Sequence, residues 1–526
     1  MQMSVGRASL FMIVTLILSR LLGWLRLSVI GAKFGESPQL DAFWAAFRIP
    51  DTLFNLLVAG ALASAFIPVF SGYLAKERED EAWRVASSVL NAIVILLVAI
   101  SALLWFLAPW IQPALAPFSD PAQRELSVRL ARIMLLSPIF MGLSALFTGI
   151  LNSYRQFLSG ATAPLVYNFL IILFAFFAAP FLGIEALAWG TVAGALMMWL
   201  VQVPELTFRR TRYKLALDLG HPGVREIVRL TVPRTLALGA VQLIFIVDTF
   251  LASKMPEGSL TALIYAFQLM QLPLGVFSIA ISAAVFPTLS QYAAQGLQAR
   301  MRELLQTAMR WILFLTLPTV VMMIVLRRPI VNLLFQYGQF GPSAREATQE
   351  AFLFYSLGLA GHALIQILAR AYYASKDTRT PLALTLVSIG TNVVLSVVLA
   401  PMYGINGLAL ANSIATLAEA ALFLVLLAPR ARLRIGGLGT SSLKVIAASL
   451  LMGIAMFAFI RATNITVDLQ QTKLGLLLQT AVAVAVGGLA YIGAATVLRV
   501  SELAEITAAV RARLARRAGA EGPTVP

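Results

Sequence analysis

Residues 85–111 read VASSVLNAIVILLVAISALLWFLAPWI and contain no Asp, Glu, Lys or Arg. A helix rises about 1.5 Å per residue, so this run is long enough to cross roughly 30 Å of membrane hydrocarbon. Comparable apolar runs recur from one end of the chain to the other. Over all 526 residues, 59% are hydrophobic, 12% are charged and the mean hydropathy is +0.84. The runs leave no room for a soluble domain, and the sequence therefore predicts an all-α integral membrane protein.

Proline, glycine and clusters of charged residues divide the chain into about fourteen expected membrane-spanning helices. Their expected ranges are 8–32, 41–73, 85–111, 126–152, 162–181, 185–207, 224–253, 260–292, 303–326, 346–373, 381–401, 405–428, 441–461 and 474–498. The first range follows Arg7 as a signal peptide would, but no small-residue cleavage site follows it. We therefore expect it to be retained as the first span.

Lys and Arg concentrate in the loops that follow the even-numbered spans, and most of the other loops are poor in them. The positive-inside rule then places both chain termini in the cytoplasm. It also explains the net charge of +16 better than nucleic-acid binding does, because the basic residues do not share one folded face. The tail, residues 499–526, is basic, and we expect it to lie on anionic lipid or to be solvated.

The residue types present exclude several kinds of chemistry. The chain has no Cys and only two His, which excludes disulfides, thiolate metal sites and a histidine-built metal centre. No Gly-Lys-Ser/Thr loop is present to hold the phosphates of a nucleotide. Four other ionisable residues within or beside spans form no acid–base pair or metal-ligand spacing, namely Glu185, His362, Arg370 and Glu419. We therefore expect a protein that is not an enzyme and has no cofactor.

Two short patterns each occur twice in the chain. The first, P-x-x-S-x-Y-x-A, is PVFSGYLA at 68–75 and PTLSQYAA at 287–294. The second, A-P-x-x-G-I-x-x-L-A, is APFLGIEALA at 179–188 and APMYGINGLA at 400–409. Chance similarity between apolar segments is the alternative, but Pro, Gly and Tyr recur in register. The patterns therefore indicate an internal duplication.

An even number of expected spans separates the two copies. This predicts two six-helix lobes in the same orientation, related by an axis along the membrane normal, at residues 1–215 and 216–430. Two further spans, in residues 431–498, fall outside the repeat. Proteins built from such repeats commonly transport by alternating access around the cleft between their lobes.

Charged side chains within a span are costly unless they face protein or water, so they mark candidate functional sites. In the first span, Ser19, Arg20 and Arg26 lie within roughly one third of the helix circumference. The planar fork of an arginine matches phosphate oxygens, so this face suits a multivalent anion. Alternatively, the arginines reach toward lipid headgroups or pair with a carboxylate such as Asp41 or Asp51.

The second and seventh expected spans carry the other candidates. Asp41 and Arg48 are two turns apart on one face, whereas Arg48 and Asp51 are i, i+3 neighbours for which a simple ion pair is an equally good interpretation. Arg234 opens the second lobe, where it either faces the cleft or reaches toward headgroups. Asp248 lies further along the same span.

Six local motifs are distributed over nearly the whole chain, namely SRLLGWLR (19–26), DAFWAAFRIP (41–50), AFIPV (65–69), LMQLPLGV (269–276), FQYGQF (335–340) and KDTRTP (376–381). Together they resemble the MurJ/MviN lipid II flippases, of the superfamily that also contains MATE drug exporters. The resemblance implies two lobes around a cationic cavity in a bacterial plasma membrane. It also implies movement of an undecaprenyl-pyrophosphate-linked disaccharide-pentapeptide from the cytoplasmic to the outer leaflet, with the last two spans forming a groove for the lipid tail.

Several residues match functional positions of that family. Ser19, Arg20, Arg26 and Asp41 fall on such positions, and Arg48 stands where a lysine is common. The chain also departs from the family, because Phe54, Ala59, Gln268 and Gln271 stand where many members carry charged residues. We expect Arg234 to compensate for Gln268.

Some members of the family bind sodium in the second lobe. Asp248 matches a carboxylate of that site and Asn392 an amide, whereas Ser396 replaces a second carboxylate. The resemblance therefore implies a weak or absent sodium site.

Other functions stay open at this point. They are a flippase for another polyprenyl-linked oligosaccharide, a MATE-like exporter, which would favour an acidic cleft, and a membrane-bound glycan ligase, which would need a large outer loop with carboxylates. The longest outer loop, near 327–345, has three arginines but only Glu346 beside it. We expect a monomer in the membrane with a lipid-linked glycan as its substrate and no nucleic-acid partner.

Overall fold

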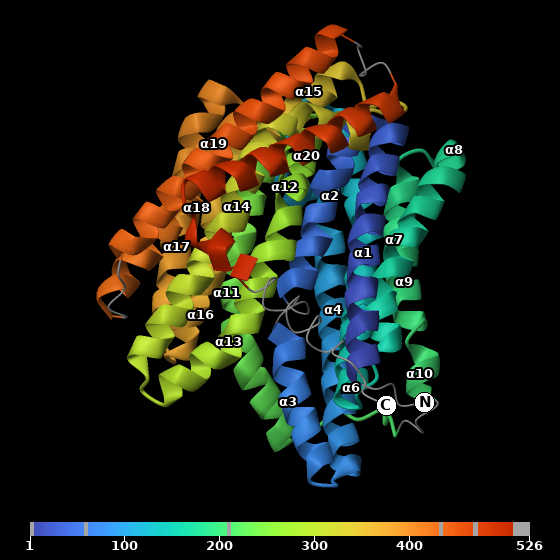
Figure 1. The fold of residues 1–526 in the computed structure, drawn as a ribbon. Helices are drawn as coiled ribbons and strands as arrows, with labels where there is room; N and C mark the ends of the chain where they lie inside the picture. The colour runs from blue at the N-terminus through green and yellow to red at the C-terminus, as the bar shows by residue number, and fades with distance from the viewer. Residues whose placement is uncertain are drawn as a thin grey trace, which may run out of the picture. The chain divides into compact units, whose positions relative to one another are not determined.

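A computed structural model describes residues 5–56, 61–207, 212–430, 435–466, 472–505 and 507–508, and every regular element in these ranges is helical (Figure 1). The elements are α1 (Val5–Phe34), α2 (Pro38–Phe54), α3 (Ala61–Ala75), α4 (Glu79–Leu115), α5 (Pro121–Met134), α6 (Ser137–Ser153), α7 (Leu158–Phe177), α8 (Ala179–Leu182), α9 (Glu185–Leu200), α10 (Val203–Thr207), α11 (Pro222–Ala252), α12 (Ser259–Pro273), the π-helix η2 (Leu274–Ser278), α13 (Ile279–Ala294), α14 (Gln298–Phe335), α15 (Pro342–Leu357), α16 (Leu359–Ala374), α17 (Arg379–Tyr403), α18 (Ile405–Arg430), α19 (Ile435–Thr466) and α20 (Lys473–Val497).

Within the described residues, ten helical segments are long and apolar enough to cross a membrane, or eleven if α15 and α16, which are bent by 40°, form one span. The prediction of an all-helical, multi-span membrane protein is thus confirmed. Three other expected spans correspond to α1, to α2 with α3, and to α11. These helices carry most of the charged candidates.

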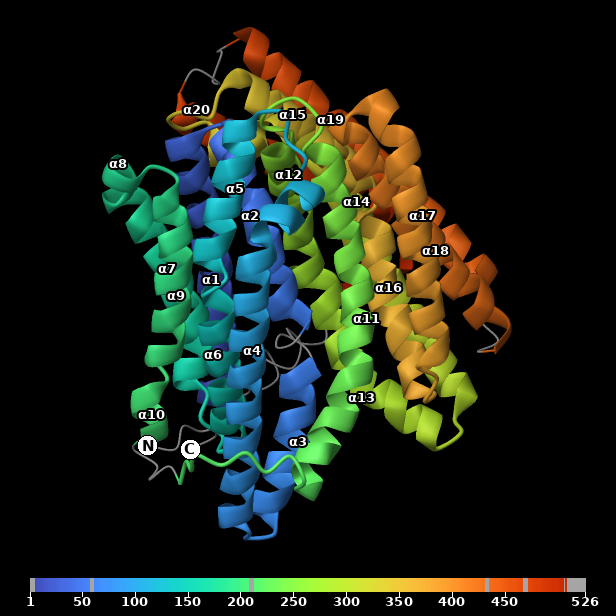
Figure 2. The ribbon, with the colours of Figure 1, turned by 180° about the vertical axis from the view of Figure 1, so that it is seen from behind.

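The chain divides into two compact units. Unit 1 comprises residues 1–262 and 334–344, and unit 2 comprises residues 263–333 and 345–526. In unit 1, α7 packs against both α1 and α9, and α2 packs against α5 (Figures 1 and 2). The side chains of Phe66, Phe70 and Trp83 are buried where α3, α4 and α6 meet. This apolar core fixes the helices that surround α2.

Unit 2 is built from helical hairpins. The longest antiparallel pairings are α17 with α18 and α19 with α20, and α16 packs against α18. Tyr491 of α20 donates a hydrogen bond to the carbonyl of Phe314 in α14 (2.8 Å), and both residues belong to one buried apolar cluster. The last two helices are thereby attached to α14.

Both copies of the A-P-x-x-G pattern adopt the same backbone turn. Gly183 has φ 56° and ψ −137°, and Gly404 has φ 57° and ψ −139°. Each glycine N–H donates to the carbonyl four residues earlier (2.9 Å), that of Ala179 in the first copy and that of Ala400 in the second. Each turn leads directly into a helix, α9 or α18. The turn conformation therefore repeats together with the sequence.

A third equivalence has no counterpart in the two sequence patterns. Arg155 and Lys376 both have positive φ, 59° and 61°. The N–H of Arg155 donates to Asn152, and that of Lys376 donates to Tyr373. Positive φ is uncommon for residues other than glycine, so its recurrence at the same place in each repeat supports the duplication.

We predict that Gly404→Ala destabilises the protein by about 1–3 kcal/mol, because only glycine adopts this combination of φ and ψ without strain. The measurement is the melting temperature of the purified protein in detergent. Gly390→Ala is the matched control, since Gly390 lies inside α17, the helix that Gly404 ends, with nothing within 4 Å of an added Cβ. Equal melting temperatures for the two variants would show that the turn carries no such constraint.

Candidate functional site

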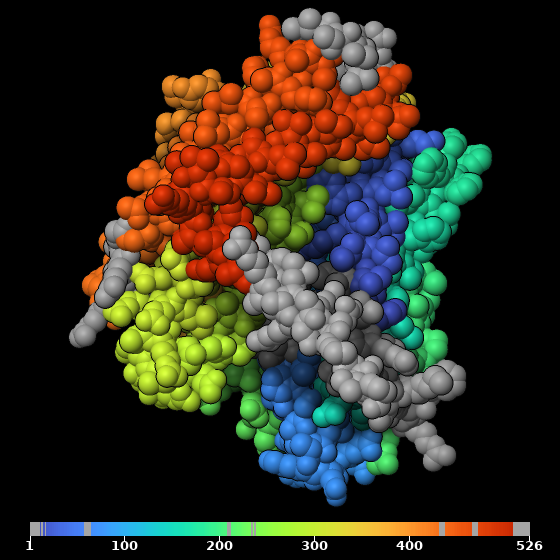
Figure 3. All heavy atoms as spheres, viewed as in Figure 1, coloured from blue at the N-terminus to red at the C-terminus, as the bar shows by residue number. Residues whose placement is uncertain are grey.

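Two arginines of α1 differ in their surroundings. Arg20 is exposed, and Figure 3 shows α1, in blue, at the molecular surface. Arg26 is half-buried, and its guanidinium carbon lies 5.9 Å from the ring centroid of Tyr167 in α7. Its Nε is buried without a hydrogen-bond partner. Neither arginine forms an ion pair with any residue that the structure describes, so the alternative of pairing with Asp41 or Asp51 is not what the geometry shows.

Arg48 of α2 is surrounded by partners. Its Nη1 lies 3.7 Å from Oδ2 of Asp51, and its Nε donates to Oγ1 of Thr249 in α11 (3.2 Å). Its guanidinium also lies 5.0 Å from the ring centroid of Phe245, in a cation–π contact. The ion pair expected from the i, i+3 spacing is therefore present, and two contacts from α11 hold the same side chain.

Asp41 accepts three hydrogen bonds from the start of α12. The donors are the backbone N–H of Gly258 (2.7 Å), the backbone N–H of Thr261 (2.9 Å) and the hydroxyl of Thr261 (2.6 Å). The first N–H groups of a helix have no partner within the helix, and the positive end of its dipole favours a carboxylate. Because the carboxylate is buried and fully used in this way, Asp41 holds the first turn of α12 within unit 1.

The remaining candidates of the anion site are placed as follows. Ser19 is half-buried on α1, next to Arg20. Arg234 belongs to α11, but its side chain lies outside the described residues. Of the four uncharged residues at usually charged family positions, Ala59 lies outside the described residues, and the other three differ in environment. Phe54 packs against the apolar cluster of Leu53 and Leu97, whereas Gln268 is exposed and Gln271 is half-buried.

The residues predicted from the resemblance to bind sodium share one property. Asp248 of α11 is buried, and its Oδ1 has no hydrogen-bond partner. Asn392 of α17 is buried with neither amide atom partnered, and the buried hydroxyl of Ser396, one turn further, is also unpartnered. Unsatisfied oxygen atoms on buried side chains are groups that a cation can satisfy. Asp248 belongs to unit 1 and the other two belong to unit 2.

Three of the four other ionisable residues singled out in the sequence have ordinary partners, whereas Nη1 of the fourth, Arg370, is buried without a hydrogen-bond partner. Nε2 of His362 lies 3.1 Å from Oδ1 of Asn412, and Glu419 accepts a hydrogen bond from Thr385 (2.9 Å). Glu185 pairs with Arg129 at 2.9 Å. These contacts agree with structural roles.

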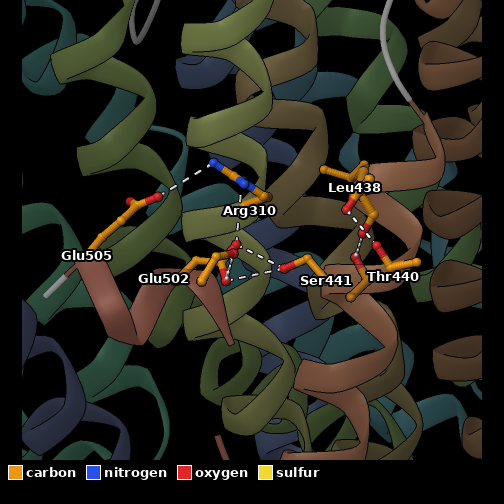
Figure 4. Close-up of polar contacts among 9 residues, drawn as sticks. Arg310, Leu438, Thr440, Ser441, Glu502 and Glu505 are labelled. Atoms are coloured by element: carbon orange, nitrogen blue, oxygen red, sulfur yellow. Dashed lines mark hydrogen bonds and ion pairs between the residues drawn. The ribbon is translucent and has the colours of Figure 1, made fainter. Parts of the chain in front are cut away.

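The first residues of the tail are fixed to unit 2 by a buried carboxylate (Figure 4). Glu502 is completely buried, accepts a hydrogen bond from Ser441 of α19 (2.9 Å), and lies 3.5 Å from Nε of Arg310 in α14. Glu505, which is more exposed, approaches the same arginine at 3.6 Å. The tail therefore begins inside the bundle, which its basic composition did not indicate.

Sequence reasoning missed the neighbours of the arginines. Tyr167, Phe245 and Thr249 come from α7 and α11, and no local pattern marks them as partners of α1 or α2. The one available signal is that Thr249 directly follows the candidate Asp248.

Solved structures with similar folds are membrane transporters. A MATE multidrug transporter of the MOP superfamily, in an inward-facing conformation, aligns over 81% of this chain and 99% of its own with a TM-score of 0.67 and 17% identity. A structure of lipid II flippase MurJ in an inward closed conformation aligns over 93% of this chain and 98% of its own with a TM-score of 0.78 and 25% identity. The fold is therefore that of the MOP superfamily of multi-pass membrane transporters.

Sequence comparison identifies the family within this superfamily. The family model described as lipid II flippase MurJ matches residues 30–478. The probable lipid II flippase MurJ of Bdellovibrio bacteriovorus is 31% identical over 499 residues, which is 93% of this chain and 94% of that protein. The lipid II flippase MurJ of Burkholderia cenocepacia is 31% identical over 402 residues, covering 75% and 78%. The chain belongs to the MurJ lipid II flippase family, whose members are transporters of the bacterial inner membrane.

We predict that Asp41→Ala destabilises the protein by about 1–3 kcal/mol or more, because it leaves buried donors of α12 without an acceptor. The readout is thermal unfolding in detergent, followed by size-exclusion chromatography. Asp120→Ala is the matched control, since exposed Asp120 caps α5 with one hydrogen bond to the N–H of Ala122, and its loss costs about 1 kcal/mol. An Asp41→Ala protein as stable as the control variant would contradict the capping role.

Proposed function

We propose that this protein moves lipid II, the undecaprenyl-pyrophosphate-linked precursor of peptidoglycan, from the inner to the outer leaflet of the bacterial plasma membrane by alternating access. Membership of the MurJ family and the names of the relatives support this substrate. The observation that carries the proposal is the unpartnered guanidinium Nε of Arg26 on a membrane helix. A buried donor without a partner is costly, and a phosphate oxygen of the substrate would satisfy it.

The two arginines of α1 bind the pyrophosphate directly in this proposal. They are separated by six residues, about 9 Å along the helix, a distance that suits a group with several anionic oxygens. The face of Tyr167 stabilises the cation at Arg26 before and after the anion is bound. Ser19 adds a hydroxyl beside Arg20.

Arg48 has a supporting role in the same proposal. Asp51, Thr249 and Phe245 already engage its guanidinium, so a substrate phosphate must share it with them. Its positive charge still lowers the cost of bringing an anion into the bundle. Asp41 contributes by holding the first turn of α12.

We propose fourteen spans, in agreement with the apolar ranges of the sequence, arranged as lobes at 1–215 and 216–430. Spans in 431–498, which correspond to α19 and α20, accommodate the lipid tail. Both termini are cytoplasmic, and the protein acts as a monomer without nucleotide. The basic tail at 499–526 stays on the cytoplasmic side.

Sodium is proposed as a possible coupling ion. Asp248 and Asn392 would contribute a carboxylate and an amide oxygen, and both have buried polar atoms without hydrogen-bond partners. Ser396 offers a hydroxyl in place of a second carboxylate, so binding would be weak.

We predict that the protein restores growth to a bacterium depleted of its own lipid II flippase, and that Arg20→Ala and Arg26→Ala each abolish this rescue. Removal of either guanidinium takes away a direct ligand of the pyrophosphate. Arg26→Lys should rescue poorly, because lysine lacks the planar fork of donors. Growth after depletion is the measurement, with membrane levels of each variant checked by immunoblot.

Arg300→Ala is the control for this set, because Arg300 is exposed at the start of α14. Normal rescue by both alanine variants would reduce Arg20 and Arg26 to structural residues. If the unaltered protein inserts but does not rescue, the substrate is another polyprenyl-linked oligosaccharide. A MATE-like export activity would instead appear as drug resistance without rescue.

We further predict that Arg234→Gln cripples rescue and that adding Gln268→Arg to this variant restores part of it. The reason is charge balance, since Gln268 stands where many family members carry an arginine and Arg234 is proposed to supply the missing cation. Gln268→Arg alone serves as the control and should retain activity. Full rescue by Arg234→Gln alone would show that Arg234 does not compensate.

A further inference from the structure

Directly before α11, residues 212–219 lie along the start of α4 without helical structure. We define this segment, residues 212–219, as the strap. Two serines of α4 bind the backbone of the strap. Ser87 accepts a hydrogen bond from the N–H of Lys214 (3.1 Å), and Ser88 accepts one from the N–H of Asp218 (3.1 Å). Both serines are fully buried beneath the strap.

Asn91 holds the middle of the strap from the same face of α4. Its amide donates to the carbonyls of Lys214 (3.4 Å) and Ala216 (2.8 Å), and its Oδ1 accepts from the hydroxyl of Tyr213 (2.7 Å). Two ion pairs fasten the ends, Arg212 with Asp80 at 2.6 Å and Arg84 with Asp218 at 2.8 Å. The strap is therefore a fixed part of unit 1.

The apolar side chains of the strap point away from this support. Leu215 is 93% exposed, Leu217 52% and Leu219 54%, and they alternate with residues whose backbone contacts α4. At Leu215 the backbone bends through a hydrogen bond from the N–H of Ala216 to the carbonyl of Lys214 (2.8 Å), a γ-turn that extends this leucine outward. Exposed apolar patches mark interaction sites, so we expect a partner to cover these three leucines.

The position of the strap along α4 identifies that partner. Residues 79–84 of α4 are mostly charged, whereas Ile95, Leu96 and Val98 are apolar and exposed, as residues facing lipid are. Asn91 lies between them, one turn, or about 6 Å, before Ile95. The leucines of the strap therefore lie at the level where hydrocarbon gives way to headgroups.

The charge of this part of the chain also agrees with a position beside the lipid headgroups. Residues 208–214 contain four basic residues and no acidic residue, and the ammonium group of Lys214 is exposed beside Leu215. Basic residues next to a membrane surface are attracted by anionic phospholipids.

We propose that the strap is a membrane-interface anchor, with Leu215, Leu217 and Leu219 inserted at the boundary of headgroups and acyl chains and Lys214 against the headgroups of anionic phospholipids. The anchor fixes the start of α11 to both α4 and the bilayer, because His221, just beyond the strap, caps that helix by accepting from the N–H of Gly223 (3.1 Å). The proposal does not depend on which substrate the protein moves.

Site-directed spin labelling tests the anchor in the full-length protein, which has no native cysteine to remove. Single cysteines replace Leu215, Leu217 or Leu219, and the labelled proteins are placed in vesicles of phosphatidylethanolamine and phosphatidylglycerol. Collision of the label with oxygen reports lipid, and collision with a water-soluble nickel chelate reports water. We expect the oxygen-to-nickel ratio of all three labels to exceed that of Lys76→Cys, on the turn before α4, several-fold.

Leu96→Cys, on the exposed face of α4, gives the ratio for a fully lipid-exposed label. We also expect Lys214→Gln to lower the strap ratios toward that of Lys76→Cys in these vesicles, and less so in vesicles of phosphatidylcholine alone. Strap labels as open to nickel as the label at position 76 would place the leucines in water. Labels shielded from both reagents would place them against protein. Either result would overturn the proposal.

Discussion

Hydrocarbon offers no hydrogen-bond partner, so polar groups inside this bundle depend on partners that the chain or a bound ligand supplies. This need for hydrogen-bond partners explains the most completely hydrogen-bonded side chains of the structure. Asp41 uses both carboxylate oxygens on the free N–H groups and hydroxyl at the start of α12. Buried Glu502 accepts hydrogen bonds from Ser441 and Ser501 and lies close to Arg310. Helices of this protein are thus positioned by a few satisfied polar groups as much as by their apolar surfaces.

The internal duplication uses the same rule at the ends of helices. A helix end leaves carbonyls unpaired, and a residue with positive φ turns the chain so that a following N–H reaches one of them. Gln156 and Asp377, which follow Arg155 and Lys376, donate their N–H groups in this way, and the two positive-φ residues occupy a region that costs energy for residues with a Cβ. Gly183 and Gly404 instead donate their own N–H groups and turn the chain without strain. The recurrence of these turns agrees with the internal duplication that the sequence patterns indicate.

The sequence was sufficient to predict the class of protein, the approximate spans and the residues that are unusual within them, because these depend on local composition. Contacts with residues of distant helices could not be predicted from the sequence. The sequence predicts Asp41 as part of an anion site, and nothing near position 41 indicates that Gly258 and Thr261 donate to it. Likewise Ser87, Ser88 and Asn91 look like minor interruptions of the apolar run that identifies the fold. Their use appears only when the strap folds onto them.

Arg48 and Arg26 differ in how much a bound anion would gain from them, because Arg48 already has partners and Nε of Arg26 has none. A ligand changes a conformational equilibrium only through contacts that differ between states. At Arg48 a bound anion exchanges existing contacts for new ones, so its net gain is small. At Arg26 it adds a bond to a donor that has none. The free energy gained on anion binding therefore comes mainly from contacts with α1. The far end of that helix is tied to the segment 334–344, since the carbonyl of Ala32 accepts from the N–H of Gln339 (2.8 Å). If α1 moves as a rigid helix when an anion binds, the FQYGQF motif moves with it.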